Sequence, residues 1–488
     1  MTTPNMYQIL SKLNHPILNG RVSTSAASKA NRLSISEDFR MTESGNALRF
    51  VHHFGKDVFY RHDKKKWFIW NGRRWEADTK ERVKKLVVEA VKKIREVELQ
   101  HIYDADEKDA LAKWISTSLS KSKINNVLDI AQSMLTAPDE LDTEMYLLNV
   151  QNGIIDLKTG ELLSHDRERY ITKFANVEYR PEATCPKWLG FLDMAFQGNQ
   201  ALIRYFQKVM GYCLTADTSE KCFFICFGPG GNNGKSMIIN VMRAVLGLDY
   251  CIQIASETLM AKKSPYVIRT DLVRLEGFRF ASASETDRCY RFDEGLIKAL
   301  SGCDVITARG MQVSEIEYTP EFKLFIATNY MPKFNLNDQA LVERVKIIPF
   351  LVTIPQEQRN KYFTDELLSE EREGILAWSV AGSVMWANEG LGTIPLEGLL
   401  EVEIKPQSTF EHFLVTCCDV ADNLSCSSGE LLAAYLEYHA EIQDGHEPLT
   451  AASFYQELSN HHFEVGHGGK CNHRVGVSLK SRRATMPE

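Results

Sequence analysis

The stretch that most constrains this chain covers residues 222–246, CFFICFGPGGNNGKSMIINVMRAVL. Its first six residues form an unbroken apolar run that is too short for a surface helix and therefore indicates a buried strand. The glycine-rich residues 228–233 predict a turn, and the Gly-Lys-Ser at 234–236 begins a helix with a periodic apolar face. A strand, a glycine loop and a Gly-Lys-Ser helix start are the setting of a phosphate-binding loop. We therefore expect an α/β core that binds a nucleoside triphosphate.

Each residue type in this loop has a physical role. Glycines let backbone N–H groups turn towards phosphates, and the N-terminus of the following helix adds partial positive charge. Lys235 is expected to reach the β and γ phosphates of ATP, and Ser236 to ligate Mg²⁺. The expected nucleotide-binding residues are Gly228, Pro229, Gly230, Gly231, Asn232, Asn233, Gly234, Lys235 and Ser236.

The loop departs from the strict motif at one position. Pro229 occupies the place of the first glycine, and Gly228 stands one residue earlier. We interpret this as a local lengthening of the turn. The alternative is an ordinary glycine-rich turn, which the flanking strand and helix patterns make the weaker interpretation.

Composition limits the class of protein. The chain has 488 residues, enough for about three domains, and its 44% hydrophobic and 25% charged residues are ordinary for a globular protein. No apolar run reaches the ~18 residues that span a bilayer, and the N-terminus shows no signal-peptide pattern, so we expect no membrane association. Eleven scattered cysteines fit a reducing compartment, and we expect the protein in the cytoplasm of a host cell.

Charge is distributed unevenly along the chain. The formal net charge is -7, but nucleic-acid binding depends on local basic surface and not on the total. Residues 56–95 contain fourteen Lys and Arg against six Asp and Glu, and fourteen minus six leaves an excess of eight positive charges. This segment is either a nucleic-acid contact or an ordinary solvated face, and both interpretations stay open.

Four segments are predicted. Residues 1–44 are rich in Ser, Thr and Asn and predict a flexible arm. Residues 45–200 combine an aromatic hairpin around an Asn-Gly turn, helical patterns and a second small β element, which predict a mixed α+β domain. Residues 201–395 alternate strand and helix patterns, as a parallel α/β domain does. Residues 405–488 show two helices followed by a glycine-tipped ribbon, which predicts a winged helix.

Three further residues are expected to complete a hydrolytic site. Glu285 follows a buried strand and can act as general base for the attacking water. Asn329 ends the next strand and can hydrogen-bond the γ-phosphate or that water, and Arg344 suits an arginine finger supplied to a neighbouring subunit. Because Ser284 stands where a second acid is usual, Mg²⁺ is expected mainly on Ser236, with Glu285 beside it. The plain alternatives are a surface acid, an Asn that caps a turn and a salt-bridged surface Arg.

In order along the chain, the segments GPGGNNGKS, FASASET, IKALSGCDVITARG, FKLFIATNYMP and ALVERVKIIPF resemble a superfamily 3 helicase. More narrowly, they resemble the helicase part of the phage, plasmid and poxvirus primase-helicase family. The segments GNALRFVHHFGKDVFYRHDKKKWFIWNGRRWEAD and LLNVQNGIIDLKTGELLSHD are similar to that family's N-terminal helicase-associated domain. The resemblance implies an AAA+-type core that assembles as a ring, usually a hexamer, with ATP between subunits. It makes Lys235 and Ser236 the Walker A residues and Glu285 the Walker B acid. It also makes Asn329 the sensor and Arg344 the finger.

The resemblance also implies a DNA-contacting element over residues 298–309 that leads into a hairpin in the ring's channel. The expected hairpin tip, residues 312–315, has no Lys or Arg. Such tips usually carry a basic residue for the phosphate backbone. The remaining basic candidates for DNA contact are Lys298, Arg309 and Lys323.

These observations predict an ATP- and Mg²⁺-dependent, ring-forming DNA helicase that unwinds duplex DNA during replication of a phage, plasmid or other mobile element. A single DNA strand is expected in the channel, origin duplex on the winged helix, and a separate primase as a further candidate partner. Two alternatives belong to other classes. One is an ATP-regulated, origin-binding initiator without processive unwinding, and the other is a P-loop kinase, which would have no use for Asn329 and Arg344 in this order.

Overall fold

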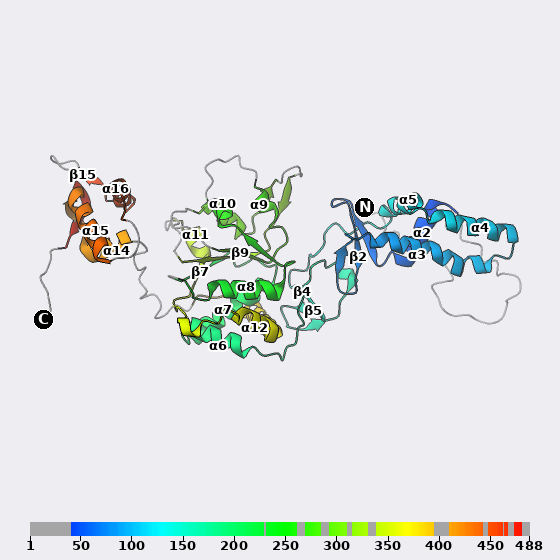
Figure 1. Cartoon of the computed structure of the whole chain (residues 1–488), viewed down its shortest axis with the longest axis horizontal. Coiled ribbons are helices and arrows are strands. Elements are labelled where there is room, and N and C mark those ends of the chain that lie inside the picture. Colours follow the sequence, from blue (N-terminus) through cyan, green and yellow to red (C-terminus); the bar gives the residue numbers. More distant parts are fainter. Residues whose placement is uncertain are drawn as a thin grey trace.

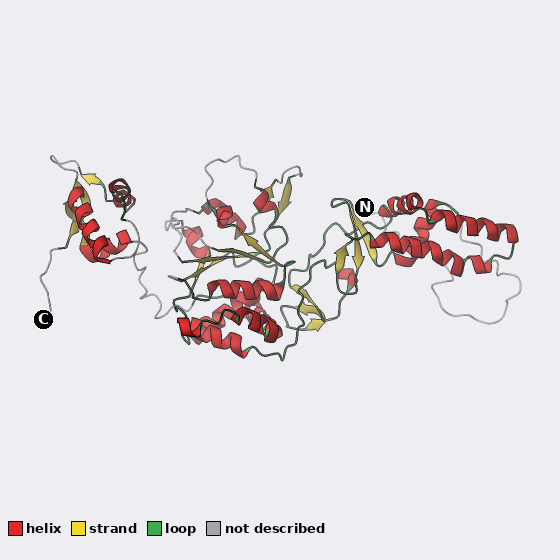
Figure 2. Cartoon of the chain, viewed as in Figure 1, coloured by secondary structure: helices red, strands yellow, loops and turns green. Residues whose placement is uncertain are grey.

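The computed structural model describes residues 41–228, 231–260, 269–284, 292–309, 315–329, 338–394, 409–442, 448–461, 463–466 and 473–480. They form a helical N-terminal part, a central α/β part and a C-terminal part (Figures 1 and 2). The arm predicted at residues 1–44 lies outside the described residues as far as residue 40.

The N-terminal part packs helices against a small antiparallel sheet. Its helices are α2 (Glu43–Phe54), α3 (Arg82–Val97), α4 (Ala105–Ser118) and α5 (Lys121–Gln132), and its strands are β1 (Val58–Arg61), β2 (Lys66–Trp70) and β3 (Trp75–Ala77). Apolar side chains of α2, α3, α5 and the sheet share one core. The predicted aromatic hairpin is confirmed, because Trp70 of β2 pairs with Trp75 of β3. Asn71 closes the turn by accepting hydrogen bonds from the N–H groups of Arg73 and Arg74 at 3.0 and 2.9 Å.

The predicted second β element is also confirmed. It consists of the antiparallel strands β4 (Leu147–Val150), β5 (Gly153–Asp156) and β6 (Leu162–Leu163). Leu148, Val150 and Ile155 from this element are buried in the same cluster as the strands of the central sheet. The core of the α/β part therefore crosses the boundary placed between residues 200 and 201.

The central part is built on a five-stranded parallel sheet with the spatial order β13-β7-β12-β9-β8. The strands are β7 (Phe223–Phe227), β8 (Cys251–Ile254), β9 (Phe280–Ser284), β12 (Lys323–Thr328) and β13 (Val345–Pro349). Parallel strands covered on both faces read as continuous apolar runs, which is why the short run ahead of the glycine loop identified β7. The expectation of a parallel α/β core is confirmed, and all five carboxyl ends meet at one edge of the sheet.

Alternate residues of each strand face opposite layers. In β7, Phe224 and Cys226 face one apolar cluster, whereas Phe223 and Ile225 face another. On the first face the ring of Phe325 lies between those of Phe224 and Phe280, with centroid distances of 4.7 and 4.8 Å. The sheet is thus the middle of three layers.

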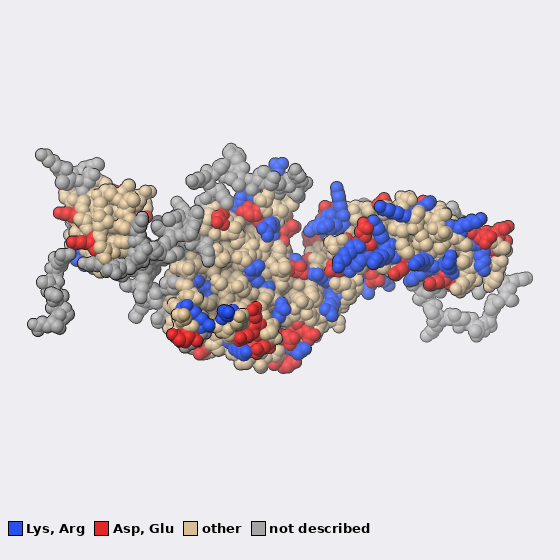
Figure 3. All heavy atoms as spheres, viewed as in Figure 1, with Lys and Arg blue, Asp and Glu red and all other residues tan. Residues whose placement is uncertain are grey.

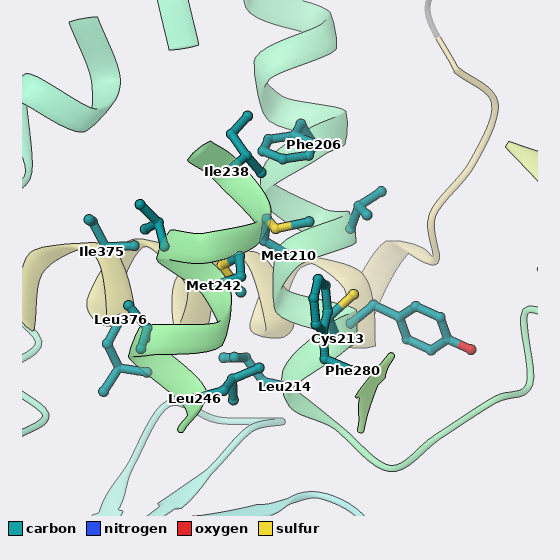
Figure 4. Packing of buried hydrophobic residues seen from close by; sticks show 14 of the residues in the cluster. Phe206, Met210, Cys213, Leu214, Ile238, Met242, Leu246, Phe280, Ile375 and Leu376 are labelled. Carbon is teal, nitrogen blue, oxygen red and sulfur yellow. The ribbon is translucent and has the colours of Figure 1, made fainter. Parts of the chain in front are cut away.

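The first face is covered by a layer of helices. These are α6 (Pro186–Ala195), α7 (Gln200–Leu214), α8 (Lys235–Leu246), α12 (Phe363–Glu370) and α13 (Arg372–Glu389). Figure 4 shows Met210 of α7, Met242 of α8 and Leu376 of α13 meeting in this layer. Gly211 of α7 and Gly382 of α13 let the two helices approach backbone to backbone. A Cβ on Gly211 would lie 1.9 Å from the N of Ser383.

The helical segment from residue 186 to residue 214 is divided between α6 and α7. The break between α6 and α7 contains Gln197 and Gly198, which have φ values of 54° and 72°. A second break falls at Glu371, between α12 and α13. The carboxylate of Glu371 accepts hydrogen bonds from the backbone N–H groups of Lys187 at 2.8 Å and Trp188 at 2.9 Å. This side chain therefore caps the start of α6 from far along the chain.

The second face carries shorter elements. These are α9 (Thr270–Val273), α10 (Glu294–Leu300), α11 (Gln339–Arg344) and the antiparallel strands β10 (Ile306–Ala308) and β11 (Ile316–Tyr318). The strands β10 and β11 flank the predicted hairpin tip. Residues 312–314 of that tip lie outside the described residues, and Glu315 is exposed.

The C-terminal part has its own apolar core. Its elements are α14 (Thr409–Cys417), β14 (Cys418–Ser427), α15 (Ser428–Ile442), α16 (Ala451–Asn460), β15 (Val465–Gly466) and β16 (His473–Leu479). The strands pair antiparallel in the order β14-β16-β15. Within the described residues of the whole chain, every helix is too short or too polar to cross a membrane.

Candidate nucleotide-binding site

The glycine loop leaves the carboxyl end of β7 and runs into the N-terminus of α8. At its start, the N–H of Gly228 donates to the carbonyl of Thr328 at 3.3 Å, and the N–H of Phe350 donates to the carbonyl of Phe227 at 2.6 Å. The loop therefore begins between the ends of β12 and β13. Pro229 and Gly230 lie outside the described residues. Ligands of open α/β sheets bind beyond the carboxyl ends of the strands, which is where this loop lies.

Two glycines are required by the geometry of the loop. Gly234 has a φ of +83°, and a Cβ there would lie 2.5 Å from Cζ of Phe191 in α6. A Cβ on Gly228 would lie 2.2 Å from the carbonyl oxygen of Phe350. A residue with a side chain would be strained at Gly234 and would collide at both positions.

The chain that follows β13 holds the other side of the loop. The N–H of Ile354 donates to the carbonyl of Asn232 at 3.0 Å, and the side-chain amide of Asn233 donates to the carbonyl of Val352 at 3.1 Å. Asn233 is buried. The loop thus has its shape from packing and hydrogen bonds within the protein.

Lys235 points back into this loop. Its side chain is buried, with 8% of its surface exposed, and Nζ donates to the carbonyl of Gly228 at 2.8 Å and to Oδ1 of Asn233 at 3.1 Å. Burial lowers the pKa of Lys235 below its usual value, because the surroundings disfavour the charged form. An anion in the loop would supply the missing negative charge.

The remaining features of the loop fit a polyphosphate. A Cβ on Gly231 would have no heavy atom within 4 Å, so the outer side of the loop is open. Ser236 is exposed in the first turn of α8, where its hydroxyl is accessible to a metal ion. An enclosed ammonium group, glycine backbone and a helix N-terminus form the set of donors that binds phosphate.

Residues at the ends of two neighbouring strands share this edge of the sheet. The register pairs Thr328 with Phe227 and Ala327 with Ser284. Asn329 directly follows β12 and is exposed at the edge from which the glycine loop leaves. Glu285 follows Ser284 in the chain but lies outside the described residues, so its predicted role stays a prediction.

Arg344 lies at the opposite edge of the sheet. It ends α11 and precedes β13, whose first residue, Val345, pairs with Phe223 at the amino end of β7. Five strand residues at about 3.3 Å each place Arg344 about 16 Å from the carboxyl edge. Its guanidinium donates to the carbonyl of Lys298 in α10. Arg344 is therefore remote from the loop of its own chain.

The three predicted DNA contacts have different surroundings. Lys298 forms an ion pair with Asp338, with Nζ 2.6 Å from Oδ2, and Arg309 is exposed after β10. Lys323 is 1% exposed, and its Nζ donates to the carbonyls of Thr215, Asp217 and Glu321. The prediction that Lys323 contacts DNA is wrong, because an ammonium group enclosed in this way does not reach a phosphate backbone.

A segment in the N-terminal half of the chain matches a known protein family. Residues 47–197 match the family described as "D5 N terminal like". Over this segment the chain is similar to the D5 N-terminal family. This confirms the resemblance to the primase-helicase family that the motifs indicated.

The relatives of this D5-like chain come from large DNA viruses. It is 27% identical to the Acanthamoeba polyphaga mimivirus protein named "Putative helicase L207/L206", over 43% of the chain and 22% of that protein. It is 24% identical to "Putative helicase 121R" of Invertebrate iridescent virus 3, over 43% of the chain and 23% of that protein. The matched segment thus spans less than a quarter of either relative.

Solved structures similar to the D5-like chain include apo forms of the NrS-1 C-terminal region. One has a TM-score of 0.43 and 12% sequence identity and covers 89% of this chain and 100% of that chain. Another has a TM-score of 0.41 at 11% identity, over 89% of this chain and 99% of that one.

Several residues that support the glycine loop of the D5-like chain could not be predicted from the sequence. Phe191 packs against Gly234 from 43 residues earlier in the chain, and Val352 and Ile354 bind the loop from more than a hundred residues later. No local pattern marks such contacts. The one available signal was the polar Asn232-Asn233 pair inside the loop, since asparagine tolerates positive φ and can bond backbone groups.

Proposed function

We propose that this D5-like chain is an ATP- and Mg²⁺-dependent DNA helicase with an AAA+-type core. The observation that carries the proposal is the enclosed Lys235, whose Nζ bonds to Gly228 and Asn233 within a glycine loop at the carboxyl edge of a parallel sheet. The D5 N terminal-like match and the viral relatives named as helicases support the DNA-unwinding function. The large DNA viruses of those relatives support a role in the replication of a mobile element.

Residues of the glycine loop and of the neighbouring strand ends would each contact a different part of bound ATP and Mg²⁺. Lys235 would exchange its two neutral acceptors for the β and γ phosphates, and Ser236 would ligate Mg²⁺. When bound, Mg²⁺ supplies positive charge to the phosphate oxygens at which negative charge develops. Asn329 would orient the attacking water or the γ-phosphate from the end of β12, and Glu285 would accept a proton from that water.

The position of Arg344 supports a site shared between subunits. It lies about 16 Å from the carboxyl edge, as five strand residues require, so it cannot serve its own loop without rebuilding β13. In a ring, most naturally a hexamer, the same residue can meet the ATP of the next subunit as an arginine finger. Its bond to the Lys298 carbonyl also links the finger to α10, which precedes the β10–β11 hairpin expected to face the channel.

The C-terminal part supports a role in holding duplex DNA. Its order of helix, strand, two helices and a two-stranded antiparallel ribbon is compatible with a winged helix. Such a domain could dock origin duplex or a separate primase. The same domain would also suit the second candidate function, which is an initiator that binds an origin and uses ATP without processive unwinding.

The proposal is tested by ATP hydrolysis with and without single-stranded DNA. We expect DNA-stimulated hydrolysis in the intact protein and a loss of about a hundredfold or more in Lys235→Ala, the scale for removing a positioned charge from a transition state. Lys346→Ala is the matched control, since Lys346 is a half-buried lysine on β13 that donates to the carbonyl of Glu343. Hydrolysis that survives in Lys235→Ala would overturn the assignment of the loop.

A further inference from the structure

A row of aromatic rings crosses the N-terminal part where β1 and β2 meet α2. Tyr60 and Trp67 are opposite each other in the register, with ring centroids 5.2 Å apart, and His62 lies 4.9 Å from Tyr60. The row continues through buried Phe50 to Phe54, with centroid distances of 6.1 and 6.2 Å. His62 is exposed, and Tyr60, Trp67 and Phe54 are half-buried. We call these four residues (Phe54, Tyr60, His62 and Trp67) the aromatic strip.

Lysines lie at both ends of the aromatic strip. At the His62 end, Lys64, Lys65 and Lys66 are exposed in the turn and at the start of β2, and Asp63, which stands between His62 and Lys64, is paired with Arg61. At the other end, Nζ of Lys93 lies 4.9 Å from the ring centroid of Phe54. Within the part of the chain that the structure describes, these four lysines form no ion pair.

The nearby acids do not cancel this charge. Residues 56–95 contain six acids, and five of them take part in ion pairs with arginine or lysine. These five are Asp57, Asp63, Glu76, Asp78 and Glu81. Figure 3 shows Lys and Arg side chains gathered over the N-terminal part. The positive field also acts locally, since Lys93 and His52 add to burial in lowering the pKa of His53.

We propose that the aromatic strip and its bordering lysines form a binding surface for single-stranded nucleic acid. Partly exposed rings in a row offer stacking platforms for successive unpaired bases, and the lysines at its two ends offer contacts for the phosphates of the same strand. In a duplex the bases are stacked inside the helix, so a duplex would contact only the lysines and not the rings. The surface belongs to a core separate from that of the glycine loop, so it does not depend on nucleotide binding.

The first test is ultraviolet crosslinking of the full chain to oligothymidylate, without nucleotide, followed by identification of the crosslinked peptide. We expect crosslinks at Tyr60, His62 or Trp67, and we expect them equally in Lys235→Ala, whose nucleotide loop is impaired. Oligouridylate is tested in parallel to show whether the strand is DNA or RNA. Crosslinks confined to the α/β and C-terminal parts would overturn the proposal while leaving the helicase function intact.

The second test measures affinity by fluorescence anisotropy over a range of salt concentrations. Lys64→Glu/Lys65→Glu should weaken binding about tenfold at low salt and reduce the slope of log K against log salt by about 1.4, as expected for two lost phosphate contacts on a single strand. His62→Ala should weaken binding about fivefold or more through lost stacking. It should have no effect on binding of an abasic strand of equal length.

The control variant is Lys108→Glu/Lys113→Glu, which makes the same change of charge at two exposed lysines of α4. We expect it to bind nearly as well as the unmodified protein. Equal losses in both double variants would show a diffuse field and not a site, and would contradict the proposal. Equal affinity for abasic and normal strands would contradict the stacking role. Stronger binding of acidic peptide than of oligothymidylate would also overturn it.

Discussion

Gly234→Ala tests whether the glycine loop depends on tertiary packing. Gly234 has a φ of +83°, and a methyl group there would lie 2.5 Å from Cζ and 2.9 Å from Cε2 of Phe191. Phe191 is 5% exposed and packs on Trp188 and Phe363, so the ring cannot move aside freely. The substitution therefore combines backbone strain with overpacking.

The two effects can be given rough magnitudes. A left-handed conformation costs a residue with a side chain about 1–2 kcal/mol, and an extra methyl group in a packed core costs about 1–3 kcal/mol. Their sum lowers the free energy of unfolding by roughly 2–5 kcal/mol. Gly231→Ala is the matched control in the same loop. A Cβ there meets no heavy atom within 4 Å, so the change should stay within about 0.5 kcal/mol.

Urea unfolding without nucleotide measures both variants. In a double variant, Phe191→Leu should recover about 1 kcal/mol or more of the loss caused by Gly234→Ala, because it removes the ring that the methyl group meets. Equal stabilities of Gly231→Ala and Gly234→Ala would show that neither backbone strain nor the ring of Phe191 requires a glycine at position 234. A double variant whose losses simply add would show that the ring of Phe191 is not the obstacle.

Three further predictions concern other parts of the α/β core. Burial lowers the pKa of Lys323 from 10.5 to about 7, so the unfolded chain binds more protons between these pH values, and the free energy of unfolding should rise with pH by up to about 1.4 kcal/mol per unit. Lys323→Met should remove this slope in urea titrations at several pH values, and an unchanged slope would contradict the assignment. Glu371→Ala should lower the free energy of unfolding by about 2 kcal/mol or more, since two backbone N–H groups of α6, one of them buried, lose their acceptor. Glu370→Ala, at an exposed neighbour, should have little effect, and similar losses would exclude a capping role. Mixing Arg344→Ala with Lys235→Ala subunits should partly restore ATP hydrolysis at hybrid interfaces, and no recovery would argue against action between subunits.

The strands of the core were predictable because a continuous apolar run in the sequence indicates a buried strand. The apolar run of β7 and the Gly-Lys-Ser start of α8 lie within 25 residues, and both elements are found as expected. The hairpin at Trp70 and Trp75 was predictable for the same reason, since Asn-Gly between two aromatic runs indicates a turn. Its register was not, because a two-residue Asn-Gly turn would pair Trp70 with Arg73 and the structure pairs Trp70 with Trp75.

The error at Lys323 shows what local pattern cannot supply. A lysine at the start of a strand is usually solvated, but here Nζ is received by carbonyls of Thr215 and Asp217, more than a hundred residues earlier. The ring of Tyr212 lies 4.8 Å from the same nitrogen. The partners come from the end of α7 and the turn after it, so only the packing of α7 on the sheet creates the enclosure.

The residues that support the glycine loop were unpredictable for the same reason. The cap of α6 by Glu371 and the ring of Phe191 beneath Gly234 join segments that are distant in sequence. By contrast, the position of Arg344 at the edge opposite the loop agrees with its place before a buried strand. Parallel register alone determines that separation.

Strand release from a forked DNA duplex tests the proposed helicase function itself. We expect strand release that requires ATP and Mg²⁺, that is lost in Lys235→Ala and that is retained in the control Lys346→Ala. Tight binding to origin duplex without strand release would favour the initiator. Strand release by Lys235→Ala at the rate of the unmodified protein would rule out ATP-driven unwinding through this glycine loop.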